Sequence, residues 1–409
     1  MSGSEQLFDL EPVDGGVTAA LGFQASGVPA GIKKSGRPDV AVLAAAIAVP
    51  AAAVYTTNAV AAAPVIVSRA HTAGGHIRAV VINAGNANAC TGERGLADAR
   101  AMADAAACAL GCAPEEVAVA STGVIGMPLP LEKVTAGIAD AAAALSPEGE
   151  DGAAAAIMTT DTFPKQSAVR VAVGERLYTV GGMAKGSGMI QPNMATMLAF
   201  VTTDAPLTPA ACDAALRAAT ARTFNRISVD SDTSTNDMCL LMASGAAGGG
   251  AIEPGGTVYA AVAAAIHHVC GELARMIVRD GEGATKFVEV TVKGAATEED
   301  AELAAFAIAN SPLCKTAVFG GDANWGRVAM AIGKSGAQVD PDAFDVVFAG
   351  IPTCVAGTAL DFDEKAAADA LAQRDVDVLV DLHVGPAAAT VWTCDLSYEY
   401  VRINGEYRS

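Results

Sequence analysis

Short apolar runs alternate with alanine-rich amphipathic segments along the first half of the chain. The runs are rich in Val, Ile and Ala and are bounded by Gly, Pro or Asn, a pattern typical of buried strands. The amphipathic segments carry charged residues at intervals that favour helices. The predicted strands are residues 39–49, 77–82 and 117–120, and the predicted helices are residues 96–110 and 131–145. The acidic stretch 146–151, which contains Pro147 and Gly149, predicts a surface loop.

The alternation continues to the end of the sequence, with a hairpin predicted at residues 168–180 around Gly174. Later strands are predicted at residues 194–201, 227–230, 238–242, 287–292, 346–348, 376–382 and 389–394. Later helices are predicted at residues 209–221, 257–279, 299–309 and 365–373. Because hairpins and crossovers are mixed, we predict an α/β fold, a layered sandwich of helices and mixed, partly antiparallel sheets. A boundary near residues 286–293 is expected to set off a smaller C-terminal α/β part, 286–409.

Composition and charge narrow the classes of function. The chain has 409 residues, of which 52% are apolar and 17% charged, so a large core can form and disorder over most of the chain is excluded. The formal net charge is −19, without a basic block, which is the wrong sign for binding phosphate backbones or an anionic membrane. We therefore expect no nucleic-acid and no membrane partner.

Two further features favour a soluble protein of the cytoplasm. The acidic N-terminal stretch lacks the basic and apolar regions of a secretory signal, and the longest apolar run, residues 40–55, is interrupted by Pro50 and is too short to span a bilayer. The nine cysteines form no CxxC pair and have no neighbouring histidines, so we interpret them as reduced, buried thiols and expect no metal site.

The predicted strand at 117–120 runs directly into Ser121, Thr122 and Gly123. Glycine just beyond a strand lets the main chain approach a ligand, so the Gly123 amide and the Thr122 hydroxyl could both donate to a developing oxyanion. The alternative is an ordinary turn between a strand and a helix.

A second candidate segment, residues 185–198, carries Lys185 and a glycine-rich stretch before Thr196. It lacks the phosphate-loop order GxxxxGK[ST], because the lysine precedes the glycines. An internal threonine is a poor nucleophile. If the bond between Ala195 and Thr196 were cut, however, Thr196 would carry an α-amine of pKa ~8 beside its own hydroxyl, so that nucleophile and base would be one residue. The alternative is a threonine that merely begins a strand.

Two further polar segments could bind an amino acid. The run TTDT at residues 159–162 combines hydroxyls with a carboxylate, and Glu282 lies between two glycines. Each also has a purely structural explanation, as a capped loop or a helix end followed by a turn. The C-terminal tail, which carries Asn404 and Ser409, is expected to be docked on the protein. The acidic run 228–237 lacks the glycine and glutamate of a calcium-binding loop.

Together these segments resemble the ornithine acetyltransferase family, the ArgJ-type glutamate N-acetyltransferases. The resemblance rests on three motifs, NAGNANACTG at residues 83–92, PNMATML at 192–198 and GDANWGR at 321–327. It implies the ArgJ/DmpA-like layered fold and self-cleavage between Ala195 and Thr196. The products would be an α chain, 1–195, and a β chain, 196–409, assembled as a heterotetramer; residues 196–285 would complete the main domain.

The resemblance also implies roles for individual residues. Thr196 corresponds to the nucleophile, and Thr122 with Gly123 to the oxyanion hole. Of the TTDT threonines, we prefer Thr162 to Thr160 as the substrate-binding residue. The remaining positions that match substrate-contacting residues are Lys185, Glu282, Asn404 and Ser409.

The implied reaction is ping-pong transfer of acetyl from N2-acetyl-L-ornithine to L-glutamate through acetyl-Thr196, within arginine biosynthesis. No cofactor is implied. Some members of the family also use acetyl-CoA as donor, and no residue of this chain decides whether it does so. The main alternative is an N-terminal-nucleophile aminopeptidase or amidase, in which water takes the acyl group. A non-enzymatic alternative is an uncleaved amino-acid-binding protein.

Overall fold

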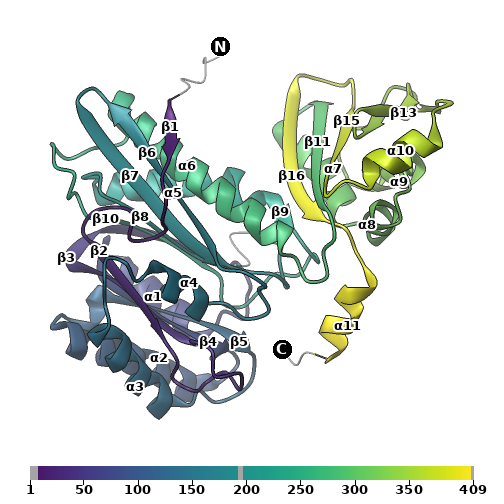
Figure 1. The fold of residues 1–409 in the computed structure, drawn as a ribbon. Coiled ribbons are helices and arrows are strands. Elements are labelled where there is room, and N and C mark those ends of the chain that lie inside the picture. Colours follow the sequence, from purple (N-terminus) through teal and green to yellow (C-terminus); the bar gives the residue numbers. More distant parts are fainter. Residues whose placement is uncertain (1–7, 192–196, 407–409) are drawn as a thin grey trace.

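The computed structural model describes residues 8–191 and 197–406. Within these residues a large sheet has the strand order β1-β6-β7-β8-β10-β3-β4-β5, and β2 pairs with β3 (Figure 1). Its strands are β1 (Leu10–Pro12), β2 (Phe23–Val28), β3 (Val40–Tyr55), β4 (His76–Asn86), β5 (Val117–Val124), β6 (Lys165–Val173), β7 (Arg176–Lys185), β8 (Leu198–Thr203) and β10 (Met238–Ala243). The pairs β8–β10 and β4–β5 are parallel and the others antiparallel, so the predicted mixed α/β sandwich is confirmed.

The large sheet folds over on itself, so that most of its strands are buried on both faces. A central apolar core lies between its two halves, a second core lies under α5 and α6, and a third under α1 to α3. Burial on both faces explains the nearly continuous apolar runs of β4, β5 and β10. The helices are α1 (Ala63–Thr72), α2 (Gly92–Leu110), α3 (Leu131–Ala143), α4 (Glu150–Ala156), α5 (Pro209–Arg222) and α6 (Gly256–Arg279), with short turns η1 (Pro114–Glu116) and η2 (Phe224–Arg226).

The prediction is wrong at the end of β3 and at the start of α4. The strand predicted to end at residue 49 continues through Pro50 to Tyr55, because β3 changes partner there: residues before it pair with β4 and residues 51–55 pair with β10. The stretch 146–151 is not wholly a loop, since Glu150 begins α4, whose alanines fill the central core. Of the strand predicted at 194–201, the described part is β8.

Helix α6 is long and apolar enough by composition to cross a membrane, but 61% of its apolar window is buried within the protein. It packs on β6, β7 and α5. Its apolar composition is therefore that of a central core helix.

A second sheet follows α6, in the order β14-β13-β12-β15-β11-β16-β9. Its strands are β9 (Ile227–Ser228), β11 (Phe287–Ala295), β12 (Asp345–Phe348), β13 (Ile351–Val355), β14 (Thr358–Ala359), β15 (Asp375–Asp381) and β16 (Ala387–Cys394). It packs with α7 (Glu298–Ala309), α8 (Pro312–Phe319), α9 (Trp325–Gly333) and α10 (Glu364–Leu371) around a core of its own. Figure 1 shows this second sheet beside the large sheet, and helix α11 (Tyr398–Glu406) follows β16 and lies below the second sheet in this view.

Candidate active site

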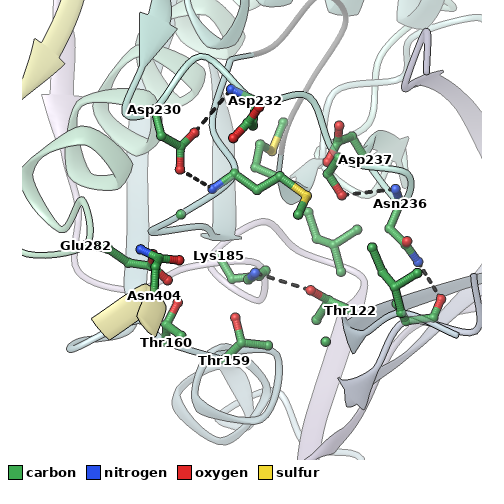
Figure 2. A pocket seen from close by; sticks show the side chains of 18 of the residues that line it. Thr122, Thr159, Thr160, Lys185, Asp230, Asp232, Asn236, Asp237, Glu282 and Asn404 are labelled. Carbon is green, nitrogen blue, oxygen red and sulfur yellow. Dashed lines mark hydrogen bonds between the residues drawn. The ribbon is translucent and has the colours of Figure 1, made fainter. Parts of the chain in front are cut away.

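A cavity of about 220 Å³ lies where the ends of β5 and β7 and the start of β8 meet the end of α6 and helix α11 (Figure 2). It brings together predicted site residues that are far apart in sequence: Thr122, Gly123, Lys185, Glu282 and Asn404. Its size suits a small metabolite rather than a drug-sized ligand.

The end of β5 carries Thr122 and Gly123 into the cavity wall. The ladder between β4 and β5 becomes irregular at Gly85 and Asn86, directly opposite. Gly123 has φ +129°, and a Cβ at this position would lie 2.4 Å from the carbonyl carbon of Gly85. Only glycine allows the two backbones to approach so closely, which gives a physical reason for the STG sequence.

Lys185, the last residue of β7, is buried and directs its ammonium at Thr122, with Nζ donating to Oγ1 at 3.2 Å. Desolvation lowers the pKa of Lys185, and the charge of Asp161 is the largest influence that opposes this. An ammonium can only donate, so the Thr122 oxygen accepts and its own proton remains available for another acceptor. This arrangement can stabilise negative charge that develops in the cavity.

Glu282 follows the end of α6 and faces α11. Its backbone nitrogen donates to the Ser187 carbonyl at 2.9 Å, and its Oε2 accepts from Asn404 Nδ2 at 2.8 Å. A Cβ on Gly188 would lie 2.3 Å from Glu282 Oε2, so the glycine-rich loop after Lys185 makes room for this carboxylate. The C-terminal helix therefore contributes directly to the wall of the cavity.

Within the TTDT segment, the structure brings Thr160 rather than the preferred Thr162 to the cavity. Thr159 and Thr160 line the cavity, whereas Thr162 is directed at Asp280: its backbone nitrogen donates to Oδ2 at 3.0 Å and its hydroxyl donates to Oδ1. The geometry thus makes Thr160 the better candidate for contact with a ligand.

Three of the predicted residues, Ala195, Thr196 and Ser409, lie outside the described residues. Met197 and Leu198, which follow Thr196 in the sequence, line the cavity. Within residues 8–191 and 197–406, no group of three His, Cys, Asp or Glu side chains is arranged to hold a metal ion.

The acidic run 228–237 supplies cavity residues that sequence reasoning missed. Asn236 Nδ2 donates to the carbonyls of Ala87 at 2.6 Å and Ser121 at 2.9 Å, which fixes the end of β5. Asp230 accepts from the Met189 and Ile190 amides at 2.6 and 2.7 Å and from the Tyr400 hydroxyl. The sequence signal for these residues is the density of Asn and Asp next to a strand.

Asp237 is a buried carboxyl group in the wall of the cavity. It is 2% exposed, and among the described residues its Oδ2 has no hydrogen-bond partner. Burial raises the pKa of Asp237 well above its ordinary value, although the Ser234 and Thr56 side chains and the charge of Lys185 act in the opposite direction.

We expect Asp237→Asn to flatten the pH dependence of stability. Because the folded-state pKa is raised, the folded protein binds the proton more tightly than the unfolded chain, so this stabilisation is complete below the ordinary pKa and is lost as pH rises towards the folded pKa. The variant should gain about 1.4 kcal/mol over wild type for each pH unit in that window. Urea unfolding at pH 5, 6 and 7 measures it, with the exposed Asp104→Asn as control; an equal slope in both variants would contradict the prediction.

Comparison with known proteins decides the family. The family model described as "ArgJ family" matches residues 24–409. The chain belongs to the ArgJ family. The "Arginine biosynthesis bifunctional protein ArgJ" of Symbiobacterium thermophilum is 57% identical over 402 residues, which are 98% of this chain and 100% of that protein. The ArgJ of Geobacter sulfurreducens is 51% identical over 389 residues, 95% of this chain and 99% of that protein.

Among solved structures, ArgJ from Bacillus halodurans is similar at 45% sequence identity, with a TM-score of 0.50. The match covers 51% of this chain and 98% of the Bacillus halodurans chain. The region matched by the ArgJ family model contains every residue that lines the cavity.

Proposed function

We propose that the protein is an acetyltransferase of arginine biosynthesis that moves an acetyl group from N2-acetyl-L-ornithine to L-glutamate. The observation that carries the proposal is the contact between Lys185 Nζ and Thr122 Oγ1 in the wall of a cavity next to the start of β8. The high identity to proteins named as arginine biosynthesis enzymes supports it.

Activation requires cleavage of the bond between Ala195 and Thr196. The Thr196 hydroxyl attacks the Ala195 carbonyl, the acyl group moves from nitrogen to oxygen, and water hydrolyses the resulting ester. The products are a chain of residues 1–195 and a chain of residues 196–409 that begins with a free threonine amine. The solved Bacillus halodurans chain matches about half of this chain, which supports a mature form in two pieces.

Acetyl transfer then uses the same hydroxyl. The Thr196 amine takes the hydroxyl proton as the oxygen attacks the acetyl carbonyl, and the Thr122 hydroxyl and Gly123 amide donate to the oxyanion. Collapse breaks the amide bond, and the proton held by the amine passes to the departing ornithine nitrogen. The glutamate amine attacks the threonine ester in turn, which releases N-acetylglutamate and restores the hydroxyl.

The charges of the cavity suit both substrates. Lys185 offers one positive charge, and Glu282 and Asp230 offer negative charge on the side covered by α11. A cation such as the ornithine side chain favours the acidic side, and a carboxylate favours Lys185. The mature form is proposed to be a cytoplasmic heterotetramer of two copies of each chain.

The decisive experiment is an assay with acetyl-labelled N2-acetyl-L-ornithine, with and without L-glutamate. Labelled N-acetylglutamate is the expected product. Free acetate alone would identify the N-terminal-nucleophile amidase instead, and no turnover with an intact 40.8 kDa chain would favour the amino-acid-binding protein. A second assay with labelled acetyl-CoA and glutamate tests whether this donor is also used.

A further inference from the structure

A buried ionic cluster lies behind the cavity wall. Lys165 is 0% exposed, and its Nζ contacts Asp161 Oδ1 at 2.7 Å and Asp280 Oδ2 at 2.6 Å. Burying three charged groups is expensive, and such clusters are often no more stabilising than apolar side chains of similar volume. Stability alone therefore gives a poor account of the cluster.

The Asp161 carboxylate holds the backbone at two places, one in the cavity wall and one directly next to it. Its Oδ1 accepts from the Gly186 amide at 2.7 Å, directly after Lys185, and its Oδ2 accepts from the Thr159 amide at 2.9 Å. One carboxylate thus fixes the backbone that carries Lys185 relative to the TTDT segment.

Asp280 extends the connection to Glu282. Besides Lys165, its carboxylate accepts from Thr162, and its backbone carbonyl accepts from Ser187 Oγ at 2.6 Å. Ser187 in turn accepts from the Glu282 amide through its carbonyl. The cluster therefore joins three segments that reach the cavity from β6, β7 and α6.

The cluster also sets the charge environment of Lys185. The charged or titratable groups that act on its ammonium are Asp161, Lys165, Asp237, Glu282 and Lys33. Burial lowers the pKa of Lys185; Asp161 opposes this most strongly, whereas Lys165 reinforces it. Asp161 and Lys165 are thus expected to influence Lys185 in opposite directions.

We propose that Asp161 is a positioning residue that fixes the backbone beyond Lys185 and keeps the Lys185 ammonium charged and directed at Thr122, with Lys165 holding Asp161 in place. The proposal deepens the proposed acetyltransferase function and rests on it only where turnover is the readout.

The first test uses Asp161→Asn, which keeps the shape of the side chain and removes its charge. The pH dependence of carbamylation of Lys185 by cyanate, followed by peptide mass spectrometry and divided by the isocyanic acid concentration at each pH, reports the fraction of neutral amine without any need for turnover. We expect the midpoint in the variant to lie about 1–3 pH units below that of wild type, as for the loss of a nearby opposite charge. An unchanged midpoint, or no modification of Lys185 in the variant, overturns the proposal.

The second test compares the pH profiles of acetyl transfer. In Asp161→Asn the alkaline limb of kcat should move to lower pH, and in Lys165→Met it should move to higher pH. The exposed Asp140→Asn on α3 is the matched control and should change neither. If Asp161→Asn lowers the stability of the protein but leaves the alkaline limb of the kcat profile unshifted, Asp161 has only a structural role and the proposal is overturned. Absence of turnover in wild type would refute the proposed function instead, and the cyanate result would still decide the role of Asp161.

Discussion

Thr196→Ala is expected to leave the protein as one uncleaved chain of 40.8 kDa without acetyl transfer. The substitution removes the hydroxyl that is proposed both to cut the chain and to carry the acetyl group. Loss of the nucleophilic serine of a serine protease lowers kcat by about 10⁶-fold, and we expect an effect of this order here. Intact-mass analysis reads the cleavage, and the labelled acetylornithine assay reads the transfer.

Thr196→Ser is the matched control for this prediction, because it keeps the hydroxyl and the amine while removing one methyl group. It should cut itself and transfer acetyl groups at a reduced rate. A Thr196→Ala protein that is still cut, or that transfers acetyl groups while uncut, would refute the proposed mechanism.

Thr122→Ala is expected to lower kcat by about 10²–10³-fold, or roughly 2.7–4 kcal/mol, as for loss of other oxyanion donors. The fold should be retained, because the substitution removes one hydroxyl from a wall built on the backbone of β5. The KM for acetylornithine should change little, since the donor acts on charge that develops only in the transition state. Steady-state kinetics with both substrates separates kcat from KM.

Thr122→Ser controls for the loss of packing. It keeps an oxygen that can accept from Lys185 and a proton that can be donated into the cavity. It should therefore retain most of the activity. If Thr122→Ala matched wild type in kcat, Thr122 would have no part in the chemistry.

Much of the fold could be predicted because strands that are buried on both faces of the large sheet have nearly continuous apolar sequences. The apolar runs of β4, β5 and β10 and the alternation of helices around them follow from it. The continuation of β3 through Pro50 could not be predicted, since it depends on the exchange of β4 for β10 as partner. Helix α4 was missed because its start lies in an acidic, proline-containing stretch.

The cavity was partly readable from sequence. Thr122, Lys185 and Glu282 stand in glycine-rich contexts whose composition packing alone explains poorly, and the structure brings them together with Asn404. The cluster of Asp161, Lys165 and Asp280 was not readable, because no local pattern shows that a lysine of β6 will meet a carboxylate beyond α6. For the same reason, sequence alone could not show that Thr162 donates a hydrogen bond to Asp280 and so points away from the cavity.

The strand order determines how the two chains of the proposed cleaved form would fit together. Strands β8 and β10, which follow the proposed cut, are inserted between β7 on one side and β3 on the other, both of which precede it. The two polypeptides would thus be interleaved, with a hydrogen-bonded seam along each border of the inserted pair. They should unfold together as a single cooperative unit, and neither should reach its native structure when produced alone.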